Sequence, residues 1–154
     1  MACRVLVPLD GSERSFGALE RALDLLRALP GLEVTLLNVM QEGFESAPEH
    51  VVEETDRDEK DELFPTEASS RRMLQRGAEL CAKRGLAARL AVVRGKVADE
   101  IVRASGDHDV VVMHGLDRSG LREKLRFSQT ERIARNARCS VLLVQDGAVP
   151  SALK

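Results

Sequence analysis

Residues 109–128 read D-V-V-V-M-H-G-L-D-R-S-G-L-R-E-K-L-R-F-S, and this stretch decides the fold. It begins as an apolar run, breaks at His114-Gly115, continues through a basic loop and ends at Ser128, where we expect a helix to start. A strand, a loop and a helix N-terminus in this order are how α/β proteins build anion sites, because unpaired helix N–H groups point into the loop. The stretch therefore predicts an α/β fold with a candidate anion site.

The rest of the chain repeats the alternation of short apolar runs with amphipathic helices. We expect strands at 4–9, 32–40, 87–93, 109–113 and 140–144, separated by helices that begin near Ser12, Thr66, Gly95 and Ser128. Apolar runs buried on both faces, joined by right-handed crossovers, predict a single-domain, doubly wound five-stranded parallel sheet with helices on both faces. Ligands bind such sheets where the strand order reverses, so we expect the strand ends at Asp10 and Met113 to flank the crevice.

The domain organisation follows from length and local composition. A chain of 154 residues most simply forms one domain, which we place at 1–147, followed by a short C-terminal tail at 148–154. An acidic segment at 41–64 follows the second strand, contains a proline and lacks a sustained apolar period. We interpret it as a solvated insertion.

Composition excludes several classes of function. A net charge of -2 gives no general attraction to nucleic acid or acidic membranes, and with no Trp or Tyr there are few aromatic side chains to stack on bases. The N-terminal apolar run is too short for a signal peptide or a membrane span, so a cytoplasmic protein is expected. The three cysteines form no CxxC pair and the three histidines are scattered, so no metal site is predicted.

The order of these motifs resembles the universal stress protein (UspA-like) family over nearly the whole chain. The resemblance lies in V-L-V-P-L-D-G-S at 5–12, D-V-V-V-M at 109–113, R-S-G-L at 118–121, S-x-x-E-R-I at 128–133 and C-S-V-L-L-V at 139–144. It implies the adenine-nucleotide α-hydrolase-like fold, in agreement with the sheet predicted above. The family contains members that bind ATP and members that do not.

In the ATP-binding members, the loop after the fourth strand resembles Gly-x2-Gly-x9-Gly-[Ser/Thr]. Glycines let the backbone approach the phosphates, and the final hydroxyl opens a helix whose N–H groups receive them. Laid on this chain without gaps, the three glycine positions fall on His114, Asp117 and Phe127, whereas the hydroxyl is kept as Ser128. The positions that match are Met113, Arg118, Ser119, Gly120 and Leu121.

Each departure from the glycine pattern has a physical consequence. His114 places a ring where the backbone should close on the phosphates, and Phe127 sets a large apolar side chain near the helix start. Asp117 adds a negative charge beside the anion, and repulsion at about 5 Å would cost roughly 1–3 kcal/mol at intermediate dielectric. Three losses at three glycine positions argue against the usual triphosphate pose.

The residues that survive also have structural explanations. Ser128 and Glu131 have the spacing of a capping box, so helix capping alone would account for the serine. Asp10 resembles the family residue that faces adenine and ribose, but an Asp before Gly is also a common turn residue. Val39 and Met113 match adenine-pocket positions, although strand ends are often apolar in any case.

A cluster of basic residues in the loop favours anion binding despite the missing glycines. Arg118, Arg122, Lys124 and Arg126 crowd this segment, and side chains of this kind can hold phosphate without glycines. A solvated surface loop, a site for a monophosphate or smaller anion, and a contact with the acidic residues of 42–62 all remain open.

We therefore predict a stress-response protein of the non-ATP-binding kind, acting as a dimeric interaction module with an unknown protein partner and without a cofactor or catalytic residues. The family resemblance implies dimers that pair through the last strand, here Val141, Leu142, Leu143 and Val144, an apolar edge that needs cover. The alternative is an ATP- or AMP-binding switch, with ATP and Mg, that uses Asp10, Val39, Met113, Gly120 and Ser128 together with Arg118 or Arg122. A nucleotide hydrolase ranks last, because no general base with a metal ligand set is displayed.

Overall fold

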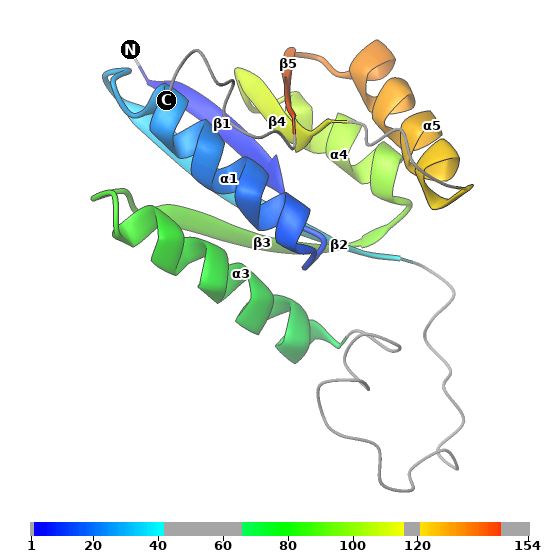
Figure 1. The fold of residues 1–154 in the computed structure, drawn as a ribbon, viewed down its shortest axis with the longest axis horizontal. Coiled ribbons are helices and arrows are strands. Elements are labelled where there is room, and N and C mark those ends of the chain that lie inside the picture. Colours follow the sequence, from blue (N-terminus) through cyan, green and yellow to red (C-terminus); the bar gives the residue numbers. More distant parts are fainter. Residues whose placement is uncertain (1, 42–65, 116–120, 146–154) are drawn as a thin grey trace, which may run out of the picture.

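The computed structural model describes residues 2–41, 66–115 and 121–145, and for residues 121–128 it describes the backbone alone. Within these residues five strands alternate with four helices (Figure 1). The elements are β1 (Cys3–Pro8), α1 (Glu13–Leu26), β2 (Leu32–Gln41), α3 (Glu67–Ala82), β3 (Ala88–Gly95), α4 (Val97–Ser105), β4 (Val110–His114), α5 (Leu121–Asn136) and β5 (Ser140–Val144). Residues 42–64 of the predicted insertion and the tail at 148–154 lie outside the described residues.

The five strands form one parallel sheet in the order β3-β2-β1-β4-β5. The chain first builds outward from β1 through β2 to β3, then returns to the other side of β1 and continues through β4 to β5. The order therefore reverses between β1 and β4, which pair at Val5 with Val110 and at Leu6 with Val111. This confirms the doubly wound parallel sheet, and it makes β1 and β4 the neighbours that flank the reversal point.

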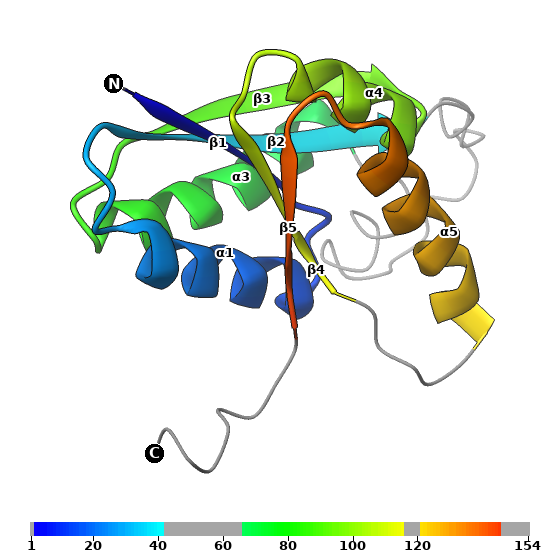
Figure 2. The same cartoon turned by 90° about the horizontal axis from the view of Figure 1, so that it is seen from above.

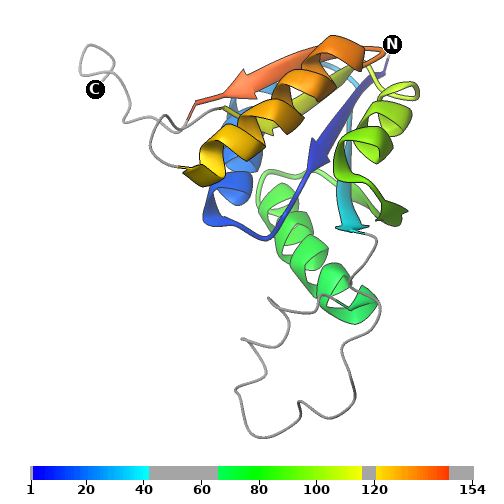
Figure 3. The same cartoon turned by 90° about the vertical axis from the view of Figure 1, so that its right-hand side faces the viewer.

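Helices cover both faces of the sheet (Figure 2). On one face α1 packs against β4 and β5 while α3 packs against β2 and β3, around a core that includes Phe16, Leu19 and Leu74. On the other face α4 contacts β1, β2, β3 and α5, around a second core with Leu6, Ile101 and Ile133. Of the outer strands, β3 contacts α3 and β5 contacts α1, and Figure 3 shows α3 toward the edge opposite β5.

Polar contacts hold α1 and α3 together above the sheet. The Arg76 guanidinium lies 2.9 Å from the carboxylate of Glu13 and 4.1 Å from the centre of the Phe16 ring. Near the other end of the pair of helices, Arg84 lies 2.9 Å from Asp24. These pairs are at least partly exposed, so each adds modestly to stability, but together they fix how the two helices lie side by side.

The helix starts follow local capping chemistry. The Ser12 hydroxyl accepts from the Ser15 N–H at 3.1 Å and caps α1. Thr66 caps α3 through a reciprocal capping box with Ser69, which confirms the predicted start of that helix. Gly85, at φ +72°, lies just beyond the end of α3 in the left-handed region that glycine adopts without strain.

The predicted start of the last helix at Ser128 is wrong, because α5 begins at Leu121. Residues 121–127 contain Leu, Arg, Glu, Lys and Phe but no Gly or Pro, so helical structure extends through them toward the N-terminus. Ser128 therefore lies inside the helix and does not cap it, although its spacing to Glu131 matches a capping box. The first helical turn lies seven positions before the expected one.

Candidate functional site

The turn that follows β1 holds Asp10 in a fixed position at the carboxyl edge of the sheet. Leu9 is anchored on both sides, since its N–H donates to the Leu37 carbonyl at 2.8 Å and its carbonyl accepts from the Asn38 amide at 2.8 Å. Gly11 then turns the chain at φ +85°. One Asp10 oxygen accepts from both the N–H and the hydroxyl of Ser12, at 2.9 and 2.5 Å. The sequence D-G-S thus positions a carboxylate and caps a helix at the same time.

The second oxygen of Asp10 faces His114, the last residue of β4. Its Oδ2 lies 3.8 Å from Nε2 of the imidazole, which is long for a hydrogen bond but within ion-pair range. Partial burial raises the pKa of Asp10, but the interactions with His114 and Ser12 outweigh it and hold the pKa well below its usual range. Asp10 is therefore a carboxylate at neutral pH, with neighbours for both of its oxygens.

The other nitrogen of the His114 ring has a different environment. Its Nδ1 is buried and has no hydrogen-bond partner among the residues that the structure describes. The side chain as a whole is 21% exposed, so one edge of the ring reaches solvent. A buried ring nitrogen without a partner costs free energy, and such an atom is a place where a ligand or water gains a hydrogen bond.

Two predicted pocket residues lie on the α4 side of the sheet. Val39 near the end of β2 and Met113 near the end of β4 are both partly buried and pack against the same apolar core as Leu6 and Ile101. They share the carboxyl edge of the sheet with Asp10. Asp10 and Met113 therefore follow or end the two strands that flank the reversal point, and Val39 lies near the end of β2, the next strand along.

The remaining predicted site residues cannot be placed in the same way. Asp117, Arg118 and Gly120 lie outside the described residues. Phe127 and Ser128 lie in the α5 helix, for which the backbone alone is described at these positions.

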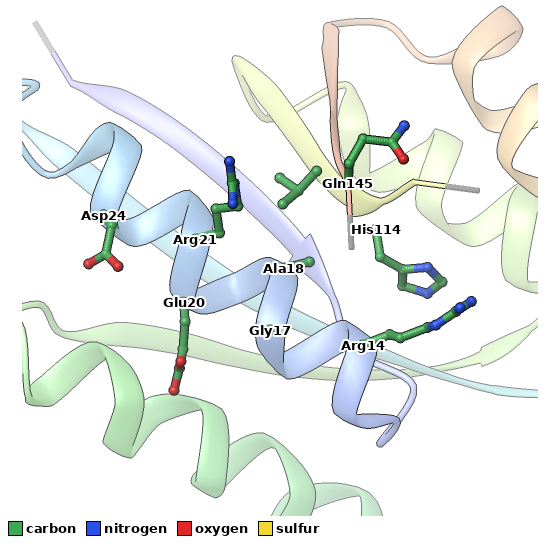
Figure 4. A pocket seen from close by; sticks show the side chains of 9 residues that line it. Arg14, Gly17, Ala18, Glu20, Arg21, Asp24, His114 and Gln145 are labelled. Atoms are coloured by element: carbon green, nitrogen blue, oxygen red, sulfur yellow. The ribbon is translucent and has the colours of Figure 1, made fainter. Parts of the chain in front are cut away.

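On the opposite face, a groove runs between α1 and the end of β5 (Figure 4). It has a volume of about 270 Å³ and is lined by Arg14, Gly17, Ala18, Glu20, Arg21, Asp24, His114, Val144 and Gln145. His114 thus lines this groove and contacts Asp10 at the reversal point. We call this pocket between α1 and the end of β5 the α1–β5 groove.

Sequence reasoning missed both the contact between Asp10 and His114 and the α1–β5 groove. The signal for the contact was present, because both residues come just at or beyond the ends of strands predicted to be neighbours, and parallel strand ends meet at one edge. The groove gave no local signal. Its residues come from one helix and from the ends of two strands that lie 90 to 131 positions further along the chain, so nothing in their spacing marks them.

The predicted dimer edge lies where the sheet ends. β5 pairs with β4 on one side and is an outer strand of the described sheet. Along it Val144 is buried and Val141 and Leu142 are half-buried, whereas Leu143 is 39% exposed. The strand thus presents an apolar edge with unpaired backbone groups.

The described residues contain no candidate for a metal site or a membrane span. Across residues 2–41, 66–115 and 121–145, no group of three or more His, Cys, Asp or Glu side chains could hold a metal ion. In the same residues no helix combines the length and the apolar character needed to cross a membrane.

Known structures share this fold along almost the whole chain. A universal stress protein family protein from Burkholderia pseudomallei is 27% identical, with a TM-score of 0.62 over 92% of this chain and 94% of its own. A family protein from Arabidopsis thaliana with AMP bound is 19% identical, with a TM-score of 0.66 over 97% of this chain and 96% of its own. A universal stress protein in complex with cAMP is 18% identical, with a TM-score of 0.68 over 95% of this chain and 98% of its own.

The sequence itself carries the same identification. No curated protein matches the chain. The sequence profile of the universal stress protein family, by contrast, matches residues 1–145. Together with the five-stranded parallel sheet and its reversal between β1 and β4, this match shows that the chain belongs to the universal stress protein family.

Proposed function

We propose that this protein is a stress-response interaction module that acts as a homodimer and does not bind ATP through the usual glycine loop. The observation that carries the proposal is the contact between His114 and Asp10. His114 stands where the ATP-binding pattern has its first glycine, and its imidazole lies 3.8 Å from the carboxylate that matches the ribose-facing residue.

The electrostatics around Asp10 support this conclusion. A ribose hydroxyl donates hydrogen bonds to a carboxylate, so it needs an oxygen of Asp10 that can accept them. One oxygen already accepts twice from Ser12, and the other faces His114. A nucleotide bound in the pose implied by the resemblance would have to displace the imidazole, and Asp117 and Phe127 replace the other two glycines as well.

The proposed dimer rests on the outer strand. An apolar strand with unpaired backbone groups invites pairing with another strand, and a second copy of β5 satisfies those groups symmetrically. The exposed Leu143 would then be covered in the pair. The partner that the dimer engages is a protein of unknown identity.

A melting experiment tests the absence of ATP binding. A ligand specific to the folded state raises the melting temperature, and the shift grows with its concentration. We expect no rise with millimolar ATP and Mg beyond that given by GTP and Mg at equal ionic strength. A rise of several degrees specific to ATP would overturn the proposal.

A gain-of-function variant tests whether the side chains at the three glycine positions are what prevents ATP binding. Replacing His114, Asp117 and Phe127 together by Gly should create ATP binding if these side chains are the block. Its matched control replaces His114 alone, which frees Asp10 but leaves the other two positions unchanged. An ATP-dependent rise in the melting temperature of the triple variant, smaller or absent in the single variant, is the expected result.

A second candidate function is binding of an adenosine monophosphate. One observation favours it: Asp10, Val39 and Met113 all lie near the carboxyl ends of neighbouring strands, and a monophosphate needs fewer phosphate contacts than ATP. Two of the similar structures hold AMP and cAMP. Titration of AMP while following the methyl signals of Val39 and Met113 separates the candidates. Saturable shifts would favour the monophosphate site, and unchanged signals would favour the interaction module.

We also propose that the protein is not an enzyme. His114 contacts a carboxylate, and the resemblance to a family of binding proteins supplies no catalytic role for that pair. Incubation with ATP and Mg should release no phosphate above the background of the buffer. Turnover that disappears in a His114→Gln variant would contradict this.

A further inference from the structure

The two outer strands of the described sheet differ in how they are protected against pairing. β3 carries the exposed side chains of Arg89 and Arg94, and charges of this kind keep an edge strand from joining another strand. β5 reads S-V-L-L-V from Ser140 to Val144, without a charged residue, a proline or a glycine. Of the two edges, β5 is therefore the one suited to pairing with a second copy.

The backbone hydrogen bonds of β5 determine which of its groups are free. The Val144 carbonyl accepts from the Gly115 N–H at 2.6 Å, so it points toward β4. In an extended strand the N–H and C=O of one residue point to the same side, and the side alternates along the chain. Every second residue back from Val144 therefore points toward β4, whereas the backbone groups of Val141 and Leu143 point to the free edge.

The side chains of β5 alternate between the two faces of the sheet. Leu142 and Val144 pack into the core on the α1 side. Leu143 pairs in register with Met113, which packs in the core on the α4 side, so Leu143 belongs to that face and is 39% exposed there. Val141 shares the α4 face by alternation. The edge thus presents apolar side chains on both faces.

We propose that two copies of the chain pair through antiparallel β5 strands with Leu142 on the two-fold axis, and that this register places Ser140 of the partner subunit beside Val144 at the α1–β5 groove. The inference rests on the homodimer proposed above and adds its register and a residue that each subunit gives to the other. A two-fold axis makes the contact self-complementary, since each strand meets an identical one that runs the opposite way.

Matching of the outward-facing backbone groups selects Leu142 as the centre. In an antiparallel pair, opposite residues exchange both backbone hydrogen bonds only when the groups of both face the neighbouring strand. With Leu142 on the axis, Val141 of each copy lies opposite Leu143 of the other, so both outward-facing residues are paired within the strands. With Leu143 or Val141 on the axis, one of them would lie opposite Gln145 or Cys139, beyond the ends of β5. An axis between two residues would set outward-facing groups against inward-facing ones.

The same register covers the apolar edge on both faces of the sheet. On the α4 face, the exposed Leu143 contacts Val141 of the partner subunit. On the α1 face, Leu142 meets Leu142 of the partner subunit. Opposite residues that do not exchange hydrogen bonds have Cα atoms about 4.5 Å apart, so the two leucine side chains pack against each other.

The register also completes the α1–β5 groove. Val144 lines this groove, and two positions from the axis it lies opposite Ser140 of the partner subunit. Side chains that are directly opposite point to the same face of a sheet, so this hydroxyl stands next to Val144 on the α1 side. Each groove thus has one wall from α1 and another to which the partner subunit contributes.

Cysteine cross-linking measures the register directly. In the full chain, Cys3→Ser and Cys139→Ser remove the two partly exposed cysteines, and the buried Cys81 stays. Leu142→Cys is added to this background, because opposite Cα atoms about 4.5 Å apart lie within disulfide range. Mild oxidation followed by non-reducing gel electrophoresis gives the rate of cross-linking, and circular dichroism confirms that each variant is folded.

Three single-cysteine variants serve as matched controls. Val141→Cys and Leu143→Cys lie on the same strand, but in the proposed register the two copies of either residue have Cα atoms about 8 Å apart, beyond disulfide range. Leu29→Cys, at a position that is 43% exposed and off the strand, controls for random collision. We expect Leu142→Cys to cross-link roughly tenfold faster than any of the three.

A pair of cysteines tests the residue given to the groove. Ser140→Cys together with Val144→Cys should cross-link the two subunits, whereas neither change alone should do so. The two positions lie about 13 Å apart along one strand, so no disulfide within a subunit competes. Because this pair is independent of Leu142→Cys, it decides the register also where that variant does not fold.

The outcomes separate the register from the dimer itself. A monomeric mass of the reduced Cys3→Ser/Cys139→Ser protein by light scattering would refute both proposals. A dimeric mass with rapid cross-linking through Val141→Cys or Leu143→Cys alone would keep the dimer and refute the register. A dimeric mass without cross-linking at any position in β5 would assign the contact to another surface and overturn the inference as well.

Discussion

Two glycines inside helices allow a matched test of how α3 packs on the sheet. A Cβ added at Gly77 of α3 would lie 2.8 Å from Cδ1 of both Leu36 and Leu9 and 3.4 Å from Cδ2 of Leu19. The same addition at Gly17 of α1 meets nothing within 4 Å. Replacing each glycine by Ala therefore makes the same chemical change in a crowded and in an open place.

The expected magnitudes follow from two effects. Ala is favoured over Gly in a helix interior by about 1 kcal/mol, and this gain is common to both variants. At Gly77 two leucine side chains that are buried in the core must also move, and overpacking of this kind costs roughly 1–3 kcal/mol. The difference in unfolding free energy between the variants is thus the overpacking cost. Gly77→Ala should be less stable than Gly17→Ala by about 1–3 kcal/mol.

Urea unfolding followed by far-UV circular dichroism measures this difference, since the chain has no Trp or Tyr for fluorescence. For a protein of this size, 1 kcal/mol corresponds to about 2–4 °C in melting temperature, which gives an independent check. Equal stability of the two variants, or a more stable Gly77→Ala, would refute the close packing of α3 on Leu9 and Leu36.

Three further predictions concern a carboxylate, a buried hydroxyl and the outer strand. The low pKa of Asp10 stabilises the fold above its ordinary pKa of 3.8 and loses this effect on acidification, so the stability deficit of Asp10→Asn should shrink below about pH 4; a pH-independent deficit in urea unfolding would contradict it. Ser105→Ala should cost about 1–3 kcal/mol by the same assay, because the buried hydroxyl accepts from the Arg138 N–H at 2.9 Å; a loss below about 0.5 kcal/mol would show that another group replaces it. Leu143→Lys should give monomers by light scattering, and an unchanged mass would refute pairing through β5.

Much of the fold could be predicted from the sequence because local patterns of residues determine the strands and several helix starts. Apolar runs of four to ten residues gave all five strands, and capping residues such as Ser12 and Thr66 gave two helix starts. Strand ends shifted by one or two residues, as for the third strand, which continues to Gly95. Such shifts arise because pairing with β2 at Met40 and Gln41 extends β3 beyond its apolar run.

The predicted start of α5 was wrong because it relied on one local pattern. A capping box is a local signal, and the helix formers that precede Ser128 outweigh it. The prediction of the site was incomplete for a different reason. The sequence marked His114 only as a departure from the glycine pattern, and its neighbour Asp10 was not predicted. That contact joins residues about a hundred positions apart and follows from the predicted pairing of the first and fourth strands, a signal that was present but was not applied to His114.

The backbone hydrogen bond from Gly115 to the Val144 carbonyl, at 2.6 Å, continues the pairing of β4 and β5 beyond the end of β4. It ties the residue that precedes positions 116–120 to the strand whose free edge is proposed for dimer formation. In the proposed dimer, a ligand that repositions Gly115 would break this hydrogen bond or shift the end of β5, and ligand binding would then be linked to self-association. By reciprocity, whatever factor the ligand changes in the dimer dissociation constant, dimer formation changes in the affinity for the ligand. If the proposed dimer forms, its monomer–dimer equilibrium would offer a way to screen candidate ligands.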